Sequence, residues 1–212
     1  MSSTNRGGKR TEADNYPSPP WTVWRLLERL GEQLPKGHWY EPCAGEGAII
    51  QAAQHHGLEG VTWCANEIRE AALPVLQKFV DDDLISLGNC LDPSVGARNP
   101  EVIITNPPFS IAWDFLQLSL RRWPRSHLVL LLRLNFWGSD DRQGFMQKFP
   151  PDTYVLPNRP DFRGQGKTDS IEYAWMHWKP APRARDFGQI SVLDSTPLEE
   201  RRSAMSMITF PE

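Results

Sequence analysis

The 212-residue sequence lacks the features of several common classes of protein. No apolar run is long enough to cross a membrane, and the N-terminus has no signal-peptide core, so we expect a soluble protein without a membrane partner. The 23 Lys and Arg residues stand against 26 Asp and Glu residues, which gives a formal net charge of −3. This balance excludes a strongly basic protein that coats nucleic acid without specificity, but it allows a local basic face.

Cysteine is scarce, and its spacing forms no metal-binding pattern. The three cysteines, Cys43, Cys64 and Cys90, include no Cys-x-x-Cys pair, and the five histidines have no metal-ligand spacing. We therefore expect reduced thiols in a cytoplasmic protein and no bound metal. The sequence also lacks the Gly-x-Ser-x-Gly elbow of hydrolases and the His-x-Glu with Cys-x-x-Cys of zinc deaminases, which excludes both classes.

The hydrophobic pattern predicts alternating helices and strands. Helices are predicted at about 21–34, 47–56, 69–79, 111–122 and 139–148, and strands at 38–41, 61–66, 84–88, 101–105 and 127–134. The segments 152–156 and 172–178 are expected to pair as an antiparallel hairpin at the sheet edge. This alternation predicts an α/β fold with a doubly wound, mostly parallel sheet and helices on both faces.

Length and pattern together indicate one domain at 16–180. Residues 1–15 are polar, without apolar periodicity, and are expected to be disordered. Beyond residue 180 the pattern fades, so 181–212 is predicted to be an arm or a mostly irregular tail.

The most informative segment is Asn106-Pro107-Pro108-Phe109, which follows an apolar predicted strand. The Asn106 amide oxygen can accept a hydrogen bond from an amine, and Pro107 has no N–H, so its carbonyl is left as a second acceptor. Phe109 offers a flat surface for a planar substrate. The segment resembles the (Asp/Asn/Ser)-Pro-Pro-(Tyr/Phe) motif of the amino-methyltransferases, which holds a planar target nitrogen for methylation. That resemblance implies catalytic roles for Asn106, Pro107 and Phe109.

A second motif, Glu-Pro-Cys-Ala-Gly-Glu-Gly-Ala at residues 41–48, lies between a predicted strand and a predicted helix. It is neither the dinucleotide pattern Gly-x-Gly-x-x-Gly nor a P-loop. It resembles the S-adenosylmethionine motif of adenine methyltransferases, in which an acidic residue precedes Pro and a Gly-x-Gly turn. The carboxylate suits the positive end of the methionine moiety, and the glycines allow close approach of the backbone. The predicted cofactor residues of this motif are Glu41, Cys43, Ala44, Gly45 and Gly47.

The same resemblance adds cofactor residues elsewhere in the chain. It implies that Glu67, with Ile68 beside it, binds the ribose hydroxyls, and that Asp92 accepts from the adenine amine. Tyr16 and Ser18 would contact the cofactor's carboxylate, although Ser18 stands where the family usually has Thr. Asn106 completes the cofactor set. The family's sheet has seven strands with the last antiparallel, which agrees with the predicted elements.

A polar, Gly-containing loop between the last two predicted strands is the candidate for target binding. It resembles a loop of small phage and bacterial adenine methyltransferases. Its basic residues could bind phosphates, and its aromatic residue could stack on an extruded base. The predicted substrate-binding residues are Arg159, Phe162, Arg163 and Lys167; a solvated hairpin loop is the alternative.

The resemblance implies transfer of a methyl group from S-adenosylmethionine to N6 of adenine in DNA, with the base flipped out of the duplex. An RNA adenine, a cytosine N4 or a protein glutamine amide remain alternatives, because an Asn-Pro-Pro-aromatic site can hold any planar amine. A catalytically silent nucleic-acid-binding module is a further alternative. The chain has no room for a large separate target-recognition domain. Nothing in it indicates an oligomeric state.

Overall fold

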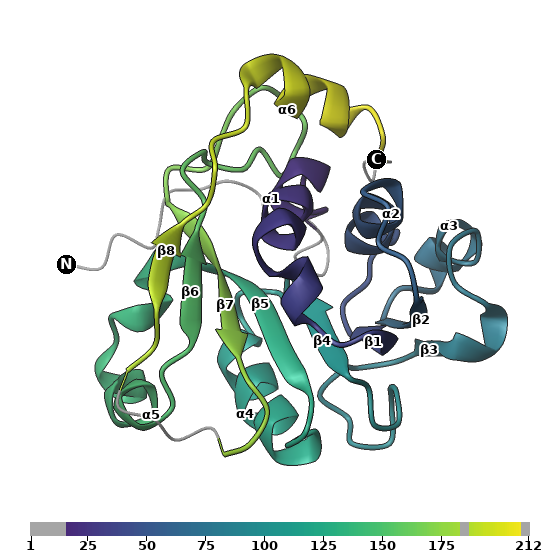
Figure 1. Cartoon of the computed structure of the whole chain (residues 1–212). Helices are drawn as coiled ribbons and strands as arrows, with labels where there is room; N and C mark the ends of the chain where they lie inside the picture. Colours follow the sequence, from purple (N-terminus) through teal and green to yellow (C-terminus); the bar gives the residue numbers. More distant parts are fainter. Residues whose placement is uncertain (1–15, 183–186, 209–212) are drawn as a thin grey trace.

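A computed structural model describes residues 16–182 and 187–208; the predicted disordered segment 1–15 lies outside the described residues. Within these residues the protein has one sheet of eight strands in the order β3-β2-β1-β4-β5-β7-β6-β8 (Figure 1). The strands are β1 (Gly37–Glu41), β2 (Val61–Glu67), β3 (Ile85–Leu87), β4 (Val102–Thr105), β5 (His127–Arg133), β6 (Asp152–Val155), β7 (Tyr173–Trp178) and β8 (Ile190–Val192).

The predicted doubly wound α/β sheet is confirmed. Strands β1 to β5 pair in parallel, and β7 is antiparallel to both β5 and β6. The predicted hairpin of β6 and β7 is present, but it does not form the sheet edge, because β8 pairs with the outer side of β6. The described residues therefore contain eight strands where seven were expected.

Helices cover both faces of the sheet. The α-helices are α1 (Pro20–Leu30), α2 (Ala48–His55), α3 (Leu73–Leu76), α4 (Ala112–Arg122), α5 (Gln143–Lys148) and α6 (Leu198–Met205). The 3₁₀ helices are η2 (Gly31–Gln33), η3 (Glu70–Ala72), η4 (Asp82–Leu84), η5 (Leu134–Trp137) and η6 (Asp140–Arg142). Helices α1 and α2 lie on one face, and α4 and α5 on the other (Figure 1).

The apolar strand β5 shows why the sheet needs two helical layers. Successive side chains of a strand point to opposite faces. Accordingly Leu130 packs in the core on the α4 side, and its neighbours Val129 and Leu131 pack in the core on the α1 side. All three are fully buried. A continuous apolar strand is stable only when both of its faces are covered.

Helix α3 is much shorter than the predicted helix at 69–79. Arg69 is extended, η3 follows, and α3 begins at Leu73 with Pro74 in its first turn. Proline has no N–H to donate to a carbonyl four residues earlier, so a continuous α-helix from residue 69 cannot run through Pro74.

The predicted irregular tail contains two ordered elements. β8 adds to the sheet, and α6 packs beside α1, where Arg25 forms an ion pair with Glu200 and donates from Nε to Thr196 Oγ1 at 3.0 Å. Leu193 and Ala204 are buried in the core on the α1 side. A three-residue strand and a helix rich in charge carry little hydrophobic pattern, so neither element could be predicted from periodicity.

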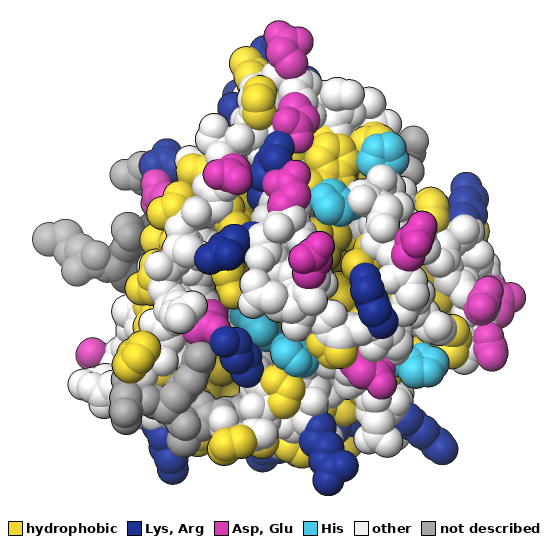
Figure 2. Space-filling view, in the orientation of Figure 1, with side chains coloured by type: hydrophobic (Ala, Val, Ile, Leu, Met, Phe, Trp, Pro, Cys, Tyr) yellow, Lys and Arg dark blue, Asp and Glu magenta, His cyan; other side chains and the backbone are white. Residues whose placement is uncertain are grey.

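Charged side chains of both signs are interspersed on the face seen in Figure 2. No described helix is long and apolar enough to cross a membrane.

Two neighbouring residues of α6 test the packing of the tail. Ala204 is 1% exposed, whereas the side chain of Ser203 faces solvent. We expect Ala204→Arg to lower the free energy of unfolding by about 2 kcal/mol or more, because a long charged side chain must enter a packed core. Ser203→Arg should change it by less than about 0.5 kcal/mol. Denaturant titrations of both variants measure this, and equal effects would mean that α6 does not dock.

Candidate active site

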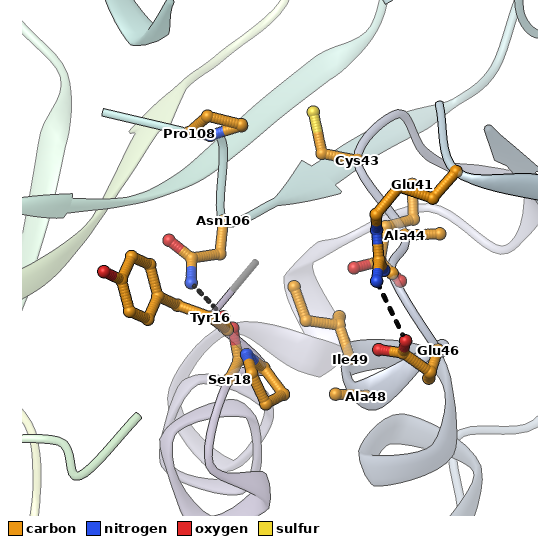
Figure 3. A pocket seen from close by; sticks show the side chains of 13 residues that line it. Tyr16, Ser18, Glu41, Cys43, Ala44, Glu46, Ala48, Ile49, Asn106 and Pro108 are labelled. Atoms are coloured by element: carbon orange, nitrogen blue, oxygen red, sulfur yellow. Dashed lines mark hydrogen bonds and ion pairs between the residues drawn. The ribbon is translucent and has the colours of Figure 1, made fainter. Parts of the chain in front are cut away.

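A cleft opens where the strand order reverses, at the carboxyl ends of β1 and β4. These two strands are neighbours, but the chain crosses between them through β2 and β3, so no loop fills the space above their ends. Figure 3 shows this cleft and the 13 residues that line it. They are Tyr16, Pro17, Ser18, Glu41, Cys43, Ala44, Gly45, Glu46, Ala48, Ile49, Arg69, Asn106 and Pro108.

The Glu41 carboxyl group is buried at the end of β1, with 2% of the residue exposed. Its Oε2 has no hydrogen-bond partner among the described residues. Burial raises the pKa of Glu41 well above the ordinary glutamate value, and the nearby Glu67 raises it further. A buried carboxylate is costly unless a cation or hydrogen-bond donors compensate it. The position therefore suits a ligand that brings a positive group into the cleft.

The turn after β1 is shaped by two glycines and one backbone contact. Gly45 and Gly47 have φ angles of +56° and +77°, a region that favours glycine. A Cβ on Gly47 would also stand 3.2 Å from Leu76 Cδ1. The Ala44 N–H donates to the Asn66 carbonyl at 2.9 Å. The turn is thereby held against the end of β2, and α2 starts at the floor of the cleft.

Glu67, at the end of β2, is already engaged by protein groups. Its Oε2 accepts from the Gly45 N–H at 2.7 Å, and its Oε1 accepts from the Arg69 N–H at 2.8 Å and from Arg69 Nε at 3.0 Å. Arg69 Nη1 also lies 3.1 Å from Glu46 Oε1. Arg69 is not among the predicted residues, and a ribose on Glu67 would have to share this carboxylate with it. Ile68, between them, is 60% exposed and is not among the residues that line the cleft.

Asn106, directly after β4, has a fixed side-chain orientation. Its Nδ2 donates to the Tyr16 backbone carbonyl at 3.1 Å (Figure 3). A carbonyl oxygen can only accept, so the amide nitrogen must face Tyr16, and Oδ1 is left as an acceptor for another group. The N-terminal segment thus orients Asn106, and the predicted Ser18 follows in the same segment, 2% exposed.

An aromatic group adjoins Asn106. Phe109 is partly exposed, and its ring centroid lies 6.5 Å from that of Tyr16 at an interplanar angle of 23°. It lies 6.0 Å from the ring centroid of Tyr173. Pro107 is buried, and Pro108 lines the cleft. The structure therefore brings Asn106, Pro107 and Phe109 together with Tyr16 at the end of β4.

Asp92 is not brought into the cleft. Its Oδ1 accepts from the Ser94 N–H and from Ser94 Oγ, both at 2.8 Å, and these bonds lower its pKa. It is an exposed residue that caps a local turn. Cys90 is closer to the predicted site, because its Sγ lies 3.6 Å from Sγ of Cys43, which lines the cleft. The Cys90 contact and burial raise the pKa of the Cys43 thiol.

The predicted substrate-binding residues separate into three groups. Arg159 donates from Nε to Glu172 Oε1 at 3.0 Å, so it is tied into its own hairpin. Phe162 is 7% exposed and packs edge-on against Tyr173, with centroids 4.9 Å apart. Lys167 is exposed on the loop, and the Arg163 guanidinium lies 5.8 Å from the centroid of the Tyr16 ring. Of these four, Arg163 and Phe162 contact a residue that lines the cleft.

Within the described ranges, no three His, Cys, Asp or Glu side chains are grouped as metal ligands.

No protein-family model matches the sequence, and no curated protein matches it. Solved structures do match the fold. A type I restriction-modification methyltransferase subunit from Streptococcus thermophilus aligns with a TM-score of 0.61 at 14% identity, over 98% of this chain and 55% of that one. This chain thus spans about half the length of that subunit.

Two further solved structures have the same architecture. A proposed class I S-adenosylmethionine-dependent methyltransferase from Listeria monocytogenes aligns with a TM-score of 0.62 at 14% identity, over 93% of this chain and 72% of that one. A proposed RNA methyltransferase from Pyrococcus horikoshii aligns with a TM-score of 0.55 at 16% identity, over 82% and 92%. The fold is therefore the Rossmann-like fold of class I methyltransferases.

The buried Glu41 carboxyl group makes a prediction about the ligand-free protein. Because its folded-state pKa is raised, its contribution to stability is fully present below about pH 4.5, the ordinary value, and is lost as the pH rises through the folded-state pKa. Glu41→Gln removes the charge and keeps the shape. We expect it to raise the free energy of unfolding at pH 8, with a gap that closes toward pH 4.5.

Denaturant titrations across this pH range measure the effect, with Glu59→Gln as a control because Glu59 is exposed. A Glu41→Gln protein less stable than the wild type at pH 8 would contradict a carboxyl group whose charged form is disfavoured by burial.

Proposed function

We propose that this chain transfers a methyl group from S-adenosylmethionine to the N6 amine of adenine in DNA. The observation that carries the proposal is the orientation of Asn106. Its Nδ2 is held by the Tyr16 carbonyl, so its Oδ1 is the group available to accept an N–H from a substrate in the cleft.

The residues around the cleft fit S-adenosylmethionine. This molecule carries an ammonium group, a sulfonium, a ribose and an adenine ring. Glu41 is a buried carboxyl group, and one of its oxygens lacks a partner within residues 16–182 and 187–208. The Glu67 carboxylate, which also binds Arg69, would accept from the ribose hydroxyls, and the exposed Ile68 would pack against the adenine. Cys43, Ala44, Gly45 and Gly47 would form the backbone wall. When bound, the cofactor supplies an electrophilic methyl group on its sulfonium.

The chain's own residues then orient the target amine. The Asn106 Oδ1 and the Pro107 carbonyl would accept its two N–H groups, which draws electron density onto the nitrogen and aligns its lone pair toward the methyl group. Phe109 would stack on the planar ring that bears the amine. Because transfer is direct, no covalent nucleophile is needed, and positioning and hydrogen bonding supply much of the rate.

Two features bear on the choice among the planar amines. Arg163 lies beside the cleft and Lys167 is exposed on the same loop, so their cations favour a nucleic acid over a protein amide but do not separate DNA from RNA. DNA is the nucleic acid proposed because one solved structure with this fold is named as a restriction-modification methyltransferase subunit, while another is named as a proposed RNA methyltransferase. Adenine inside a duplex must be flipped to reach a cleft of this kind. RNA adenine, cytosine N4 and a protein glutamine amide would be methylated by the same direct transfer. Analysis of the methylated product distinguishes these substrates.

The direct test is to incubate the protein with labelled S-adenosylmethionine and, separately, duplex DNA, single-stranded DNA and RNA. Each polymer is then digested to nucleosides for mass spectrometry. The proposal expects N6-methyldeoxyadenosine from DNA. N6-methyladenosine from RNA alone, or N4-methyldeoxycytidine from DNA, would replace the proposed substrate. No methylated nucleoside from any polymer, with the cofactor bound, would point to a protein amide or a binding role.

The variant Asn106→Ala tests the role of the amide. We expect methyl transfer to fall by about 100-fold or more, as when a single preorganised hydrogen-bonding group is removed from an active site. The dissociation constant for S-adenosylmethionine should change much less than the transfer rate, because Asn106 is only one of the predicted cofactor contacts, and Glu41 and the Gly45 turn are untouched. Single-turnover rates and calorimetric titrations measure the two quantities. Retained turnover would exclude the proposed role of Asn106.

Asn106→Asp refines this test. A carboxylate has no N–H to give to the Tyr16 carbonyl, so the bond that orients residue 106 is lost while an acceptor remains. We expect a transfer rate between those of the wild type and Asn106→Ala. A rate equal to that of the wild type would show that the Tyr16 contact does not matter.

A further inference from the structure

Arg133 stands at the carboxyl end of β5, beside the Asn106 turn, and no motif marks it in the sequence. β5 pairs with β4 on one side and with β7 on the other, where Arg133 is opposite Tyr173. Its guanidinium carbon lies 4.1 Å from the centroid of the Phe109 ring, over the face of that ring. The side chain is 37% exposed, so this stacking takes place at the rim of the site.

The edges of the same guanidinium hold two other groups. Nε donates to the Tyr173 hydroxyl at 3.2 Å, and Nη2 lies 3.6 Å from Asp169 Oδ2. The Tyr173 hydroxyl in turn donates to Asp169 Oδ2 at 2.6 Å. The three polar groups therefore form a closed network beneath the face-on contact with Phe109.

We propose that Arg133 is a positioning residue for the target: it fixes the Phe109 ring, on which the planar substrate stacks, and fastens the loop at 157–171 to the Asn106 turn. This inference rests on the function proposed above. One face of Phe109 is covered by the guanidinium, and two planar groups cannot share a face. The Tyr16 ring also lies near-parallel to Phe109, with centroids 6.5 Å apart, so the substrate ring has to stack on the part of Phe109 that neither Arg133 nor Tyr16 covers, which fixes the side from which its amine meets Asn106.

Asp169 carries the connection into the loop. Its N–H donates to the Pro160 carbonyl at 3.1 Å, which closes the base of the loop. Phe162 packs on Tyr173 and on Tyr16, with centroids 4.9 Å and 6.5 Å apart. The loop that carries Arg163 and Lys167 is thus connected to the Phe109 ring through Asp169, Tyr173 and Arg133.

Arginine is suited to this position and lysine is not. A guanidinium is planar, so it can stack with its flat face while its in-plane N–H groups bond to two different oxygens. An ammonium group is a single point that cannot hold the Phe109 face, the Tyr173 hydroxyl and the Asp169 carboxylate at once. Arg133→Lys should therefore resemble Arg133→Met more than the wild type.

The test compares Arg133→Met and Arg133→Lys with Arg142→Met. Arg142 stacks in the same way on Phe136, at 4.3 Å, but that ring packs in the core on the α4 side. We expect both Arg133 variants to lower kcat by about tenfold or more, because a substrate ring that is held in the wrong place reacts slowly. The dissociation constant for S-adenosylmethionine should change by less than about twofold, because Arg133 does not contact the cofactor. Arg142→Met should leave kcat unchanged.

A variant of Tyr173, the hydrogen-bond partner of Arg133, tests whether the two groups act together. Tyr173→Phe keeps the ring and removes the hydroxyl, so the rate losses of Tyr173→Phe and Arg133→Met should be non-additive in the double variant. Additive losses, or a loss of cofactor binding equal to the loss of kcat, would overturn the positioning role.

Hydrogen–deuterium exchange gives a readout that does not depend on turnover. Arg133→Met should speed exchange of the backbone amides at 157–171 and of Phe109, and Arg142→Met should not. Unchanged exchange in both segments would overturn the inference even if the kinetic effect were present. If the wild type methylated no polymer, the proposed function would fail, and the exchange data would still decide whether Arg133 fastens the loop.

Discussion

The Glu41 carboxyl group, buried at the end of β1 with one oxygen that has no partner in the described part of the chain, is the constraint on which the cleft depends. Stability alone does not favour such a group, because burial without a cation costs free energy. It is placed there by the topology: β1 and β4 are neighbours whose ends no connection covers. Because the fold holds a buried acid at this point, a cationic ligand in the cleft would compensate its charge.

The rest of the site completes that arrangement from distant parts of the chain. Tyr16, before α1, supplies the carbonyl that orients Asn106 after β4, and Arg69, after β2, ties Glu67 and Glu46 at the opposite wall. The two walls have different chemistry. One is acidic and suits a cofactor with an ammonium group and hydroxyls. The other presents an amide oxygen and an aromatic ring, which suit a planar amine.

Much of this could be predicted from the sequence, because the signals are local. Glu41 ends one strand and Asn106 directly follows another, and strand ends meet at one edge of a parallel sheet. Other parts depend on tertiary contacts that no local pattern encodes. Arg69 and Arg133 look like ordinary surface cations until the fold brings partners to them. Asp92 does not line the cleft and its Oδ1 accepts from Ser94, so its role as a cofactor ligand stays a prediction.

Calorimetric titration can show whether Glu41 binds the ammonium group of S-adenosylmethionine. The cofactor is titrated into the wild type and into Glu41→Gln, in buffers of different ionisation enthalpy. An ammonium beside Glu41 favours the charged carboxylate, so binding to the wild type should release protons at neutral pH. Glu41→Gln should bind about tenfold or more weakly, the worth of a charged hydrogen bond, and release none. Equal affinity and equal proton release in the two proteins, or no binding to the wild type, would contradict the proposed binding of the ammonium group by Glu41.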